Sequence, residues 1–188
     1  VLSGVGGDEL FGGYSHFDVL PKWKKQQDTL RKIPGIASLG TMALSFAAAV
    51  GLVPQKAVAL ASYGSSYAGL YFARRGLFMP WELPALVGEE FAKEGLAKLQ
   101  PPDFIASALG GEINNSYAAL AALEANFYLR NQLLRDSDWA SMAHSLELRT
   151  PLVDVKLLSS LAPALLNRPR GMEKKLALAN APKNALPS

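Results

Sequence analysis

A glycine-rich segment with two carboxylates, residues 3–14, carries the residue types best suited to chemistry in this sequence. It reads S-G-V-G-G-D-E-L-F-G-G-Y. Glycines let backbone N–H groups approach a ligand closely and can form a concavity that binds anions. A carboxylate beside such a turn, here Asp8, can hold a divalent cation that bridges phosphates. A glycine turn with Asp8 as a plain helix cap would explain the same residues without a ligand.

Two common nucleotide-binding motifs do not fit this segment. A P-loop requires Gly-Lys-Ser/Thr after its spacer, but Gly12 is followed by Gly13 and Tyr14. A dinucleotide fingerprint requires G-x-G-x-x-G, and the position of its last glycine is Glu9. Any phosphate site here must therefore be of another kind.

The elements that position this segment are predicted to be mainly α-helical. Val1-Leu2 resembles the end of a buried strand, and strand patterns are nearly absent after it. Short polar residues precede apolar helical patterns at three places and are predicted N-caps: Asn115, Ser137 and Asp154. Residues 81–99 have a proline-containing start and an amphipathic end.

Composition excludes several classes of protein. Hydrophobic residues make up 49% of the 188 residues and charged residues 19%, so the chain can bury a core. The net charge of +3 is weak, and the basic clusters at residues 22–32 and 168–183 are predicted to be solvated surface, with no nucleic-acid partner. The absence of cysteine fits a reducing, cytoplasmic compartment.

The longest uncharged run, residues 33–55, could in length span a bilayer. Prolines and glycines interrupt it, and alanine rather than leucine or isoleucine dominates it. We therefore predict a buried helix, no membrane partner and no signal peptide.

Three blocks together resemble the asparagine synthetase family. Residues 3–14 are similar to the family signature S-G-(acidic)-G-(small)-D-E-(apolar)-F-G-G-Y. Residues 133–154, L-L-R-D-S-D-W-A-S-M-A-H-S-L-E-L-R-T-P-L-V-D, are similar to L-L-x-x-x-D-x-x-S-M-A-x-S-x-E-x-R-x-P-F-L-D. Residues 175–178 with Leu186-Pro187 resemble K-x-x-L-R…L-P. The blocks have the order and spacing of the family and span nearly the whole chain.

The resemblance implies the C-terminal portion of an α/β ATP-pyrophosphatase-type (adenine nucleotide α-hydrolase-like) domain, mainly α here, across residues 1–188. ATP and Mg²⁺ would adenylate aspartate or another small carboxylate. Ammonia from an N-terminal glutaminase domain would then give asparagine, AMP and pyrophosphate. That domain and the phosphate-binding S-G-G-x-D-S loop are expected upstream of Val1, and the fragment alone is expected to be inactive. Among assembly states, a homodimer is an open alternative.

By position in these motifs, the resemblance assigns five site residues. Ser3, Gly4 and Gly6 would contact the nucleotide or acyl-adenylate, and Asp8 would bind Mg²⁺ with the pyrophosphate. Lys175 would neutralise charge on the phosphates and the intermediate.

Other residues of these blocks have simpler interpretations. Glu147 and Arg149 are expected to form a structural ion pair, and Trp139 and Met142 are expected in the core. His16 is expected to be a surface or satisfied residue rather than a metal ligand.

Two departures from the family pattern leave alternatives open. Val5 replaces the carboxylate that asparagine-forming members usually carry, and Ala179 replaces an arginine. A relative that forms another amide, such as a β-lactam or a secondary-metabolite amide, is one alternative. A non-catalytic binding module that retains the fold is the other.

Overall fold

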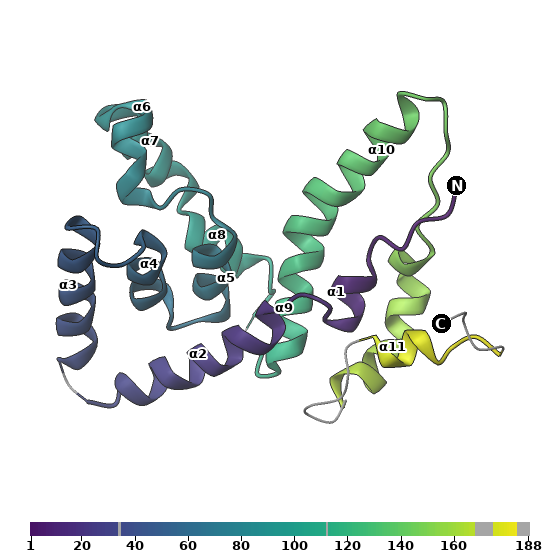
Figure 1. The fold of residues 1–188 in the computed structure, drawn as a ribbon, viewed down its shortest axis with the longest axis horizontal. Helices are drawn as coiled ribbons and strands as arrows, with labels where there is room; N and C mark the ends of the chain where they lie inside the picture. The colour runs from purple at the N-terminus through teal and green to yellow at the C-terminus, as the bar shows by residue number, and fades with distance from the viewer. Residues whose placement is uncertain (34, 112, 168–174, 184–188) are drawn as a thin grey trace. The chain divides into compact units, whose positions relative to one another are not determined.

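The computed structural model describes residues 1–33, 35–111, 113–167 and 175–183, and this part of the chain is mostly helical (Figure 1). Its first helices are α1 (Gly7–Phe11), α2 (His16–Leu30), α3 (Ile36–Ala49), α4 (Gln55–Tyr63), α5 (Tyr67–Arg75), η1 (Pro80–Glu82), α6 (Leu83–Val87), α7 (Glu89–Leu99) and α8 (Pro101–Ser107). Those that follow are α9 (Ser116–Leu123), the π-helix η2 (Glu124–Leu133), α10 (Leu134–Met142), η3 (Pro151–Val153), α11 (Val155–Leu166) and α12 (Leu176–Ala179). The prediction of a mainly α chain is confirmed.

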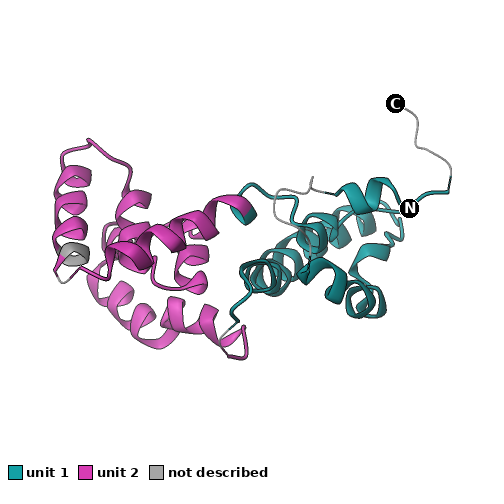
Figure 2. Ribbon diagram, turned by 90° about the horizontal axis from the view of Figure 1, so that it is seen from below, with its two compact units in different colours: residues 1–17, 113–188 teal, residues 18–112 magenta. Residues whose placement is uncertain are grey.

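The chain folds into two compact units (Figure 2). Unit 1 comprises Val1–Phe17 and Ile113–Ser188, and unit 2 comprises Asp18–Glu112. Helix α2 therefore begins in unit 1 and continues in unit 2. All five predicted site residues belong to unit 1, although the whole of unit 2 separates the glycine-rich segment from Lys175 in the sequence.

The core of unit 1 joins the glycine-rich segment to the C-terminal helices. Leu10 and Phe11 of α1 pack against Leu165 of α11, and partly buried apolar side chains surround them. Leu120 and Leu123 of α9 are wholly buried. Burial of one such side chain stabilises a fold by roughly 1.5–3 kcal/mol, so this packing holds α1 firmly.

Two of the three predicted helix caps are confirmed. The Asn115 side chain accepts a hydrogen bond from Ala118 N–H at 3.0 Å, and Asp154 accepts one from Leu157 N–H at 2.9 Å. The cap predicted at Ser137 is wrong, because η2 continues without a break into α10 and places Ser137 inside that helix.

The expectation that Trp139 and Met142 lie in the core is also wrong. Their exposed fractions are 60% and 58%. Trp139 lies instead under the guanidinium of Arg135, whose Cζ is 4.3 Å from the ring centroid, a cation–π contact on the surface.

The expected buried strand at Val1-Leu2 does not form. Both side chains are exposed, and Leu2 makes an isolated parallel bridge to Arg149 rather than joining a sheet; the described residues contain no strand. A single bridge pairs few backbone groups and does not make a sheet. The side chains of Val1 and Leu2 therefore stay uncovered in this unit.

Unit 2 has its own small core. Ala59 of α4, Phe72 and Ala73 of α5, and Met79 form it, and the partly buried Tyr63 packs against it. Helix α3 packs against α4 at one side of this unit (Figure 1). The segment predicted at residues 81–99 divides into α6 and α7 at Gly88, whose φ of 86° only glycine adopts readily.

The uncharged run at residues 33–55 forms α3, but the prediction of a buried helix is wrong. Leu39, Met42 and Phe46 on this helix are exposed by 67%, 70% and 72%. None of the described helices has the length and apolar character needed to span a bilayer.

Candidate functional site

The glycine-rich turn is fixed by backbone contacts to the chain near Arg149. Ser3 N–H donates to Arg149 O at 2.9 Å, and Arg149 N–H donates to Val1 O at 2.8 Å. The Ser3 side-chain oxygen accepts Val5 N–H at 3.3 Å, and an added Cβ at Gly4 would meet no atom within 4 Å. The turn thus has a fixed backbone and open space beside Gly4.

Gly6 is the glycine that this fold requires most directly. Its φ is 94°, and a Cβ there would lie 2.8 Å from Val153 Cγ2. Gly6 occupies the N-cap position of α1, where no side chain supplies a cap. The alternative interpretation of Asp8 as a cap is therefore wrong, because Asp8 lies inside the first turn of α1.

The structure brings the two predicted charged site residues together. Lys175 Nζ lies 2.7 Å from Asp8 Oδ1, and their side chains are exposed by 43% and 40%. Ion pairs open to solvent contribute only about 0–1 kcal/mol to stability, because water screens them. The fold does not depend on this pair, which leaves both charges available to a ligand.

Gly13 makes the approach of Asp8 and Lys175 sterically feasible. A Cβ at Gly13 would overlap Asp8 Oδ1 and would lie 2.9 Å from Lys175 Cε. Gly13 N–H also donates to Asp8 O at 2.8 Å, which closes the end of α1. The second Gly-Gly pair of the motif therefore has a steric role in the site.

Lys175 lies immediately before a short helix rather than within one. It is the N-cap of α12 and has a left-handed backbone with φ 63°. Lys174, the basic residues Arg168 and Arg170, and Leu186-Pro187 lie outside the described residues.

A buried hydrogen bond holds the residue next to Asp8. Tyr14 O–H donates to Glu9 Oε1 at 2.7 Å, while Glu9 Oε2, which is buried, has no hydrogen-bond partner in the described part of the chain. Burial, and then the bond to Glu9, raise the pKa of Tyr14 well above its usual value. Tyr14 therefore stays protonated and can keep donating to Glu9.

A second buried pair lies behind Tyr14. His16 Nε2 is 2.7 Å from Glu124 Oε1, and the two side chains are exposed by only 5% and 0%. The ring of His16 stacks between Tyr14 and Phe17, with centroids 5.3 Å and 5.2 Å away. His16 is therefore a buried residue beside a carboxylate, and its Nε2 makes no contact of hydrogen-bond geometry in the described part of the chain.

Sequence reasoning did not predict the role of Glu124, although its position carried a signal. Glu124 lies among Leu120, Leu123 and Phe127, at the helical spacing of the apolar face. A carboxylate on such a face needs a buried partner. It is also the first residue of η2, and π-helical turns often occur near functional sites.

Glu147 and Arg149 form the expected ion pair. Arg149 Nη2 lies 3.0 Å from Glu147 Oε1, with both side chains mostly exposed. The link from this segment to the turn is through the backbone of Arg149, which pairs with Val1 and Ser3. The Glu147–Arg149 ion pair therefore lies on the surface beside the glycine-rich turn and not in the core.

The metal ion that the resemblance assigns to Asp8 would have few protein ligands among the described residues. No three His, Cys, Asp or Glu side chains gather in the described ranges in a way that could hold an ion. Mg²⁺ is commonly held by one or two carboxylates together with substrate phosphates and water. The half-exposed carboxylate of Asp8 fits this donor set.

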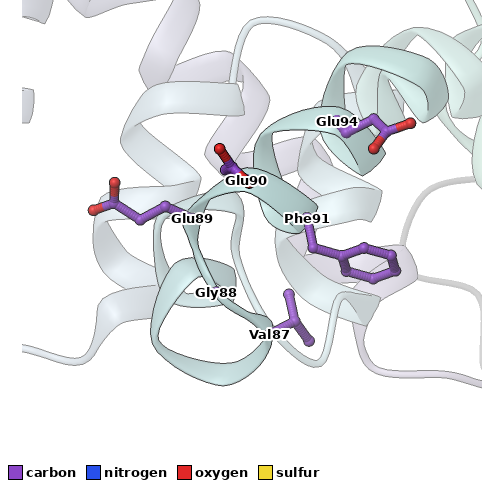
Figure 3. Close-up of a pocket in the computed structure, with 6 residues that line it drawn as sticks. All are labelled: Val87, Gly88, Glu89, Glu90, Phe91 and Glu94. Atoms are coloured by element: carbon purple, nitrogen blue, oxygen red, sulfur yellow. The ribbon is translucent and has the colours of Figure 1, made fainter.

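A hollow in unit 2 has the wrong charge for this chemistry. It has a volume of about 510 Å³ and is lined by Val87, Gly88, Glu89, Glu90, Phe91 and Glu94. The three carboxylates point in different directions (Figure 3). They would repel phosphates and do not converge on a cation, so the hollow is not assigned to the site.

The asparagine synthase family model matches residues 1–187 of this chain. The chain belongs to the asparagine synthase family. No curated protein and no solved structure matches it. Membership places the chain among enzymes of ATP-dependent amide formation. The turn at Ser3–Gly7 and the Asp8–Lys175 pair bring a cation, a carboxylate and backbone groups into one region of unit 1.

Proposed function

We propose that this chain takes part in ATP-dependent amide formation through an acyl-adenylate, with aspartate as acyl substrate and glutamine-derived ammonia as nucleophile. The observation that carries the proposal is the 2.7 Å contact between Asp8 and Lys175, which joins two motifs far apart in the sequence. Neither residue is needed for the core, so their contact is best explained by shared chemistry.

In the proposed reaction, a carboxylate oxygen of aspartate attacks the α-phosphorus of ATP and pyrophosphate leaves. Ammonia then attacks the acyl carbon, and AMP leaves with that carboxylate oxygen. Ser3 and Gly4 would line the adenylate, Gly6 shapes the turn, and Asp8 would hold the metal. A bound Mg²⁺ would supply charge neutralisation on the phosphates.

Lys175 has the position for a second form of charge neutralisation. Its ammonium now rests on Asp8, and phosphate oxygens of the substrate would replace that carboxylate as its partner. A compact ammonium placed where negative charge develops lowers the barrier, and removal of such a donor typically slows a reaction by about 10²–10³-fold.

The proposed site needs groups that these 188 residues do not contain. No S-G-G-x-D-S sequence occurs in them. We therefore propose a C-terminal part of an ATP-pyrophosphatase-type domain in a longer cytoplasmic protein, with a phosphate-binding loop and a glutaminase domain. The 188-residue chain alone should form no AMP from ATP, because positioning and charge stabilisation are both incomplete.

Formation of a different amide is the alternative that one observation favours. Val5 is apolar at the position where asparagine-forming relatives usually carry a carboxylate, so its side chain cannot move a proton. Another acyl substrate or amine would then suit the site.

The deciding experiment is a product assay on the full-length protein with ATP, Mg²⁺, aspartate and glutamine. We expect asparagine, AMP and pyrophosphate in equal amounts. AMP formed only with other carboxylates would establish the alternative amide. No AMP with any carboxylate, from a protein that binds no ATP, would identify a non-catalytic module and overturn the proposal.

A further inference from the structure

Helix α3 of unit 2 exposes a continuous apolar stripe. Leu39, Met42 and Phe46 are spaced by three and four residues, so they share one face, and they are exposed by 67%, 70% and 72%. The opposite face, which includes the buried Ala48, packs towards α4. A row of large exposed apolar side chains on one face indicates an interaction surface.

The chain on either side of α3 also exposes apolar residues. Large apolar side chains before and after the helix are also exposed: Leu30, Ile33, Val50 and Leu52. Exposed large apolar residues thus occur over more than twenty residues of the chain, from before α3 to beyond it.

The charge of this region has one sign. Residues 29–81 contain no Asp or Glu and have five cationic residues: Arg31, Lys32, Lys56, Arg74 and Arg75. Arg31 and Lys32 precede α3 and are exposed, and the exposed Lys56 follows it. Helix α3 itself contains no charged residue. An uncharged apolar helix between exposed cations is complementary to a surface that is apolar inside and anionic outside.

We propose that the face of unit 2 formed by α3 docks on an anionic membrane surface, with α3 lying in the interfacial plane. Leu39, Met42 and Phe46 would enter the boundary between headgroups and acyl chains, while Arg31 and Lys32 contact lipid phosphates. This replaces the sequence-based expectation of no membrane partner, which depended on a buried helix at residues 33–55.

Charge argues against a second copy of this chain as the occupant. Pairing of two α3 faces would bring two surfaces of the same positive sign together, and like charges oppose such a contact. An anionic bilayer offers the opposite sign and an apolar layer at once. The docking is independent of amide formation, because every residue it uses lies outside the site at Asp8 and Lys175.

The magnitudes are accessible to measurement. Each Lys or Arg near an anionic bilayer strengthens binding by about fivefold. Arg31→Gln/Lys32→Gln should therefore weaken binding by about 25-fold. Loss of one large apolar side chain from the stripe that enters the membrane, as in Phe46→Ser, should weaken binding by at least about tenfold.

Unit 2 supplies a matched control for Phe46. Phe91 of α7 is exposed by 70%, compared with 72% for Phe46, but it lines a hollow together with Glu89, Glu90 and Glu94. Phe91→Ser makes the same chemical change at the same exposure in an acidic setting (Figure 3). It should leave membrane binding unchanged.

The test is co-sedimentation of the 188-residue chain with vesicles, either pure phosphatidylcholine or an equal mixture with phosphatidylglycerol. We expect binding to the anionic vesicles alone, loss in Phe46→Ser and retention in Phe91→Ser. Circular dichroism checks that each variant is folded. Phe46→Trp adds a reporter whose fluorescence brominated lipid should quench.

Four outcomes would overturn the proposal. They are no binding to anionic vesicles, equal binding to both vesicle types, binding that Phe46→Ser leaves intact, and added fluorescence in Phe46→Trp that brominated lipid does not quench. Self-association of the chain that Phe46→Ser abolishes, without vesicle binding, would assign the face to a second copy. Capture of an acidic protein in place of vesicles would assign it to a protein partner.

Discussion

Replacement of His16 by phenylalanine should destabilise unit 1 strongly. Phenylalanine keeps the planar shape that stacks between Tyr14 and Phe17, so the aromatic packing is largely retained. The change removes the imidazole nitrogen that lies 2.7 Å from Oε1 of Glu124, whose side chain is 0% exposed. Removal of one member of a buried charged pair costs about 3–5 kcal/mol. Domains of this size are stable by about 5–15 kcal/mol, so the variant should approach the limit of folding.

The measurement is urea unfolding followed by circular dichroism, with His144→Phe as the matched control. His144 is exposed, so the same substitution there should change the free energy of unfolding by less than about 0.5 kcal/mol. The double variant His16→Phe/Glu124→Leu removes both polar groups and should recover at least about 2 kcal/mol relative to the sum of the single changes.

Two results would refute this reasoning. A loss below about 1 kcal/mol in His16→Phe would mean that Glu124 finds another partner or reaches water. Additive effects in the double variant would mean that His16 and Glu124 are not coupled, in spite of the 2.7 Å between them.

Other predictions concern the residues around Asp8. In the full-length protein, Asp8→Asn should abolish Mg²⁺-dependent AMP formation. It should change the free energy of unfolding by less than about 1 kcal/mol, because the ion pair with Lys175 is half exposed. Strong activity in a folded Asn variant would contradict the metal role. Lys175→Ala should slow pyrophosphate release by about 100-fold or more, whereas Lys183→Ala, an exposed control, should not; equal rates would remove Lys175 from the site. Gly13→Ala should force Asp8 away from Lys175, reduce activity and cost about 1–3 kcal/mol in a melting assay. The pKa of Tyr14 is raised on folding, so its contribution to stability is present below about pH 10 and is lost as the pH rises further. The free energy of unfolding of the parent should therefore fall more steeply above that pH than that of Tyr14→Phe. Parallel curves of unfolding free energy against pH would count against the burial of this phenol.

The local parts of the fold were predictable where one short-range interaction decides the outcome. Asn115 and Asp154 cap the helices expected of them, since a cap needs only its own side chain and the next turn. The cap predicted at Ser137 was wrong because a continuous helix from η2 into α10 forms in its place. That helix depends on how Glu124 and Leu129 are buried in unit 1, which a local sequence pattern does not contain.

Burial was harder to predict than helix formation. The spacing of Trp139 and Met142 gives a helical face, but spacing cannot tell whether another element covers that face, and these two are exposed. The same ambiguity affected α3, where an uncharged run looked like core and is surface. An apolar pattern identifies a face in need of a partner, and only the structure tells which faces have one.

The site was predicted in part. The motifs selected Asp8 and Lys175 without any knowledge of contact, and the structure places their charged atoms 2.7 Å apart. Gly13 and Glu124 were missed as contributors, because their roles arise from close approach of distant segments. The nucleotide and metal roles of Ser3, Gly4, Gly6 and Asp8 stay predictions.

The most direct test of acyl-adenylate formation follows the oxygen atoms. Full-length protein would be incubated with ATP, Mg²⁺, glutamine and aspartate labelled with ¹⁸O in its side-chain carboxylate, and the nucleotide products would be analysed by mass spectrometry. The proposed mechanism predicts AMP that carries one ¹⁸O and pyrophosphate that carries none, with both lost in Asp8→Asn. Release of ADP with ¹⁸O in inorganic phosphate, or AMP without label, would contradict it.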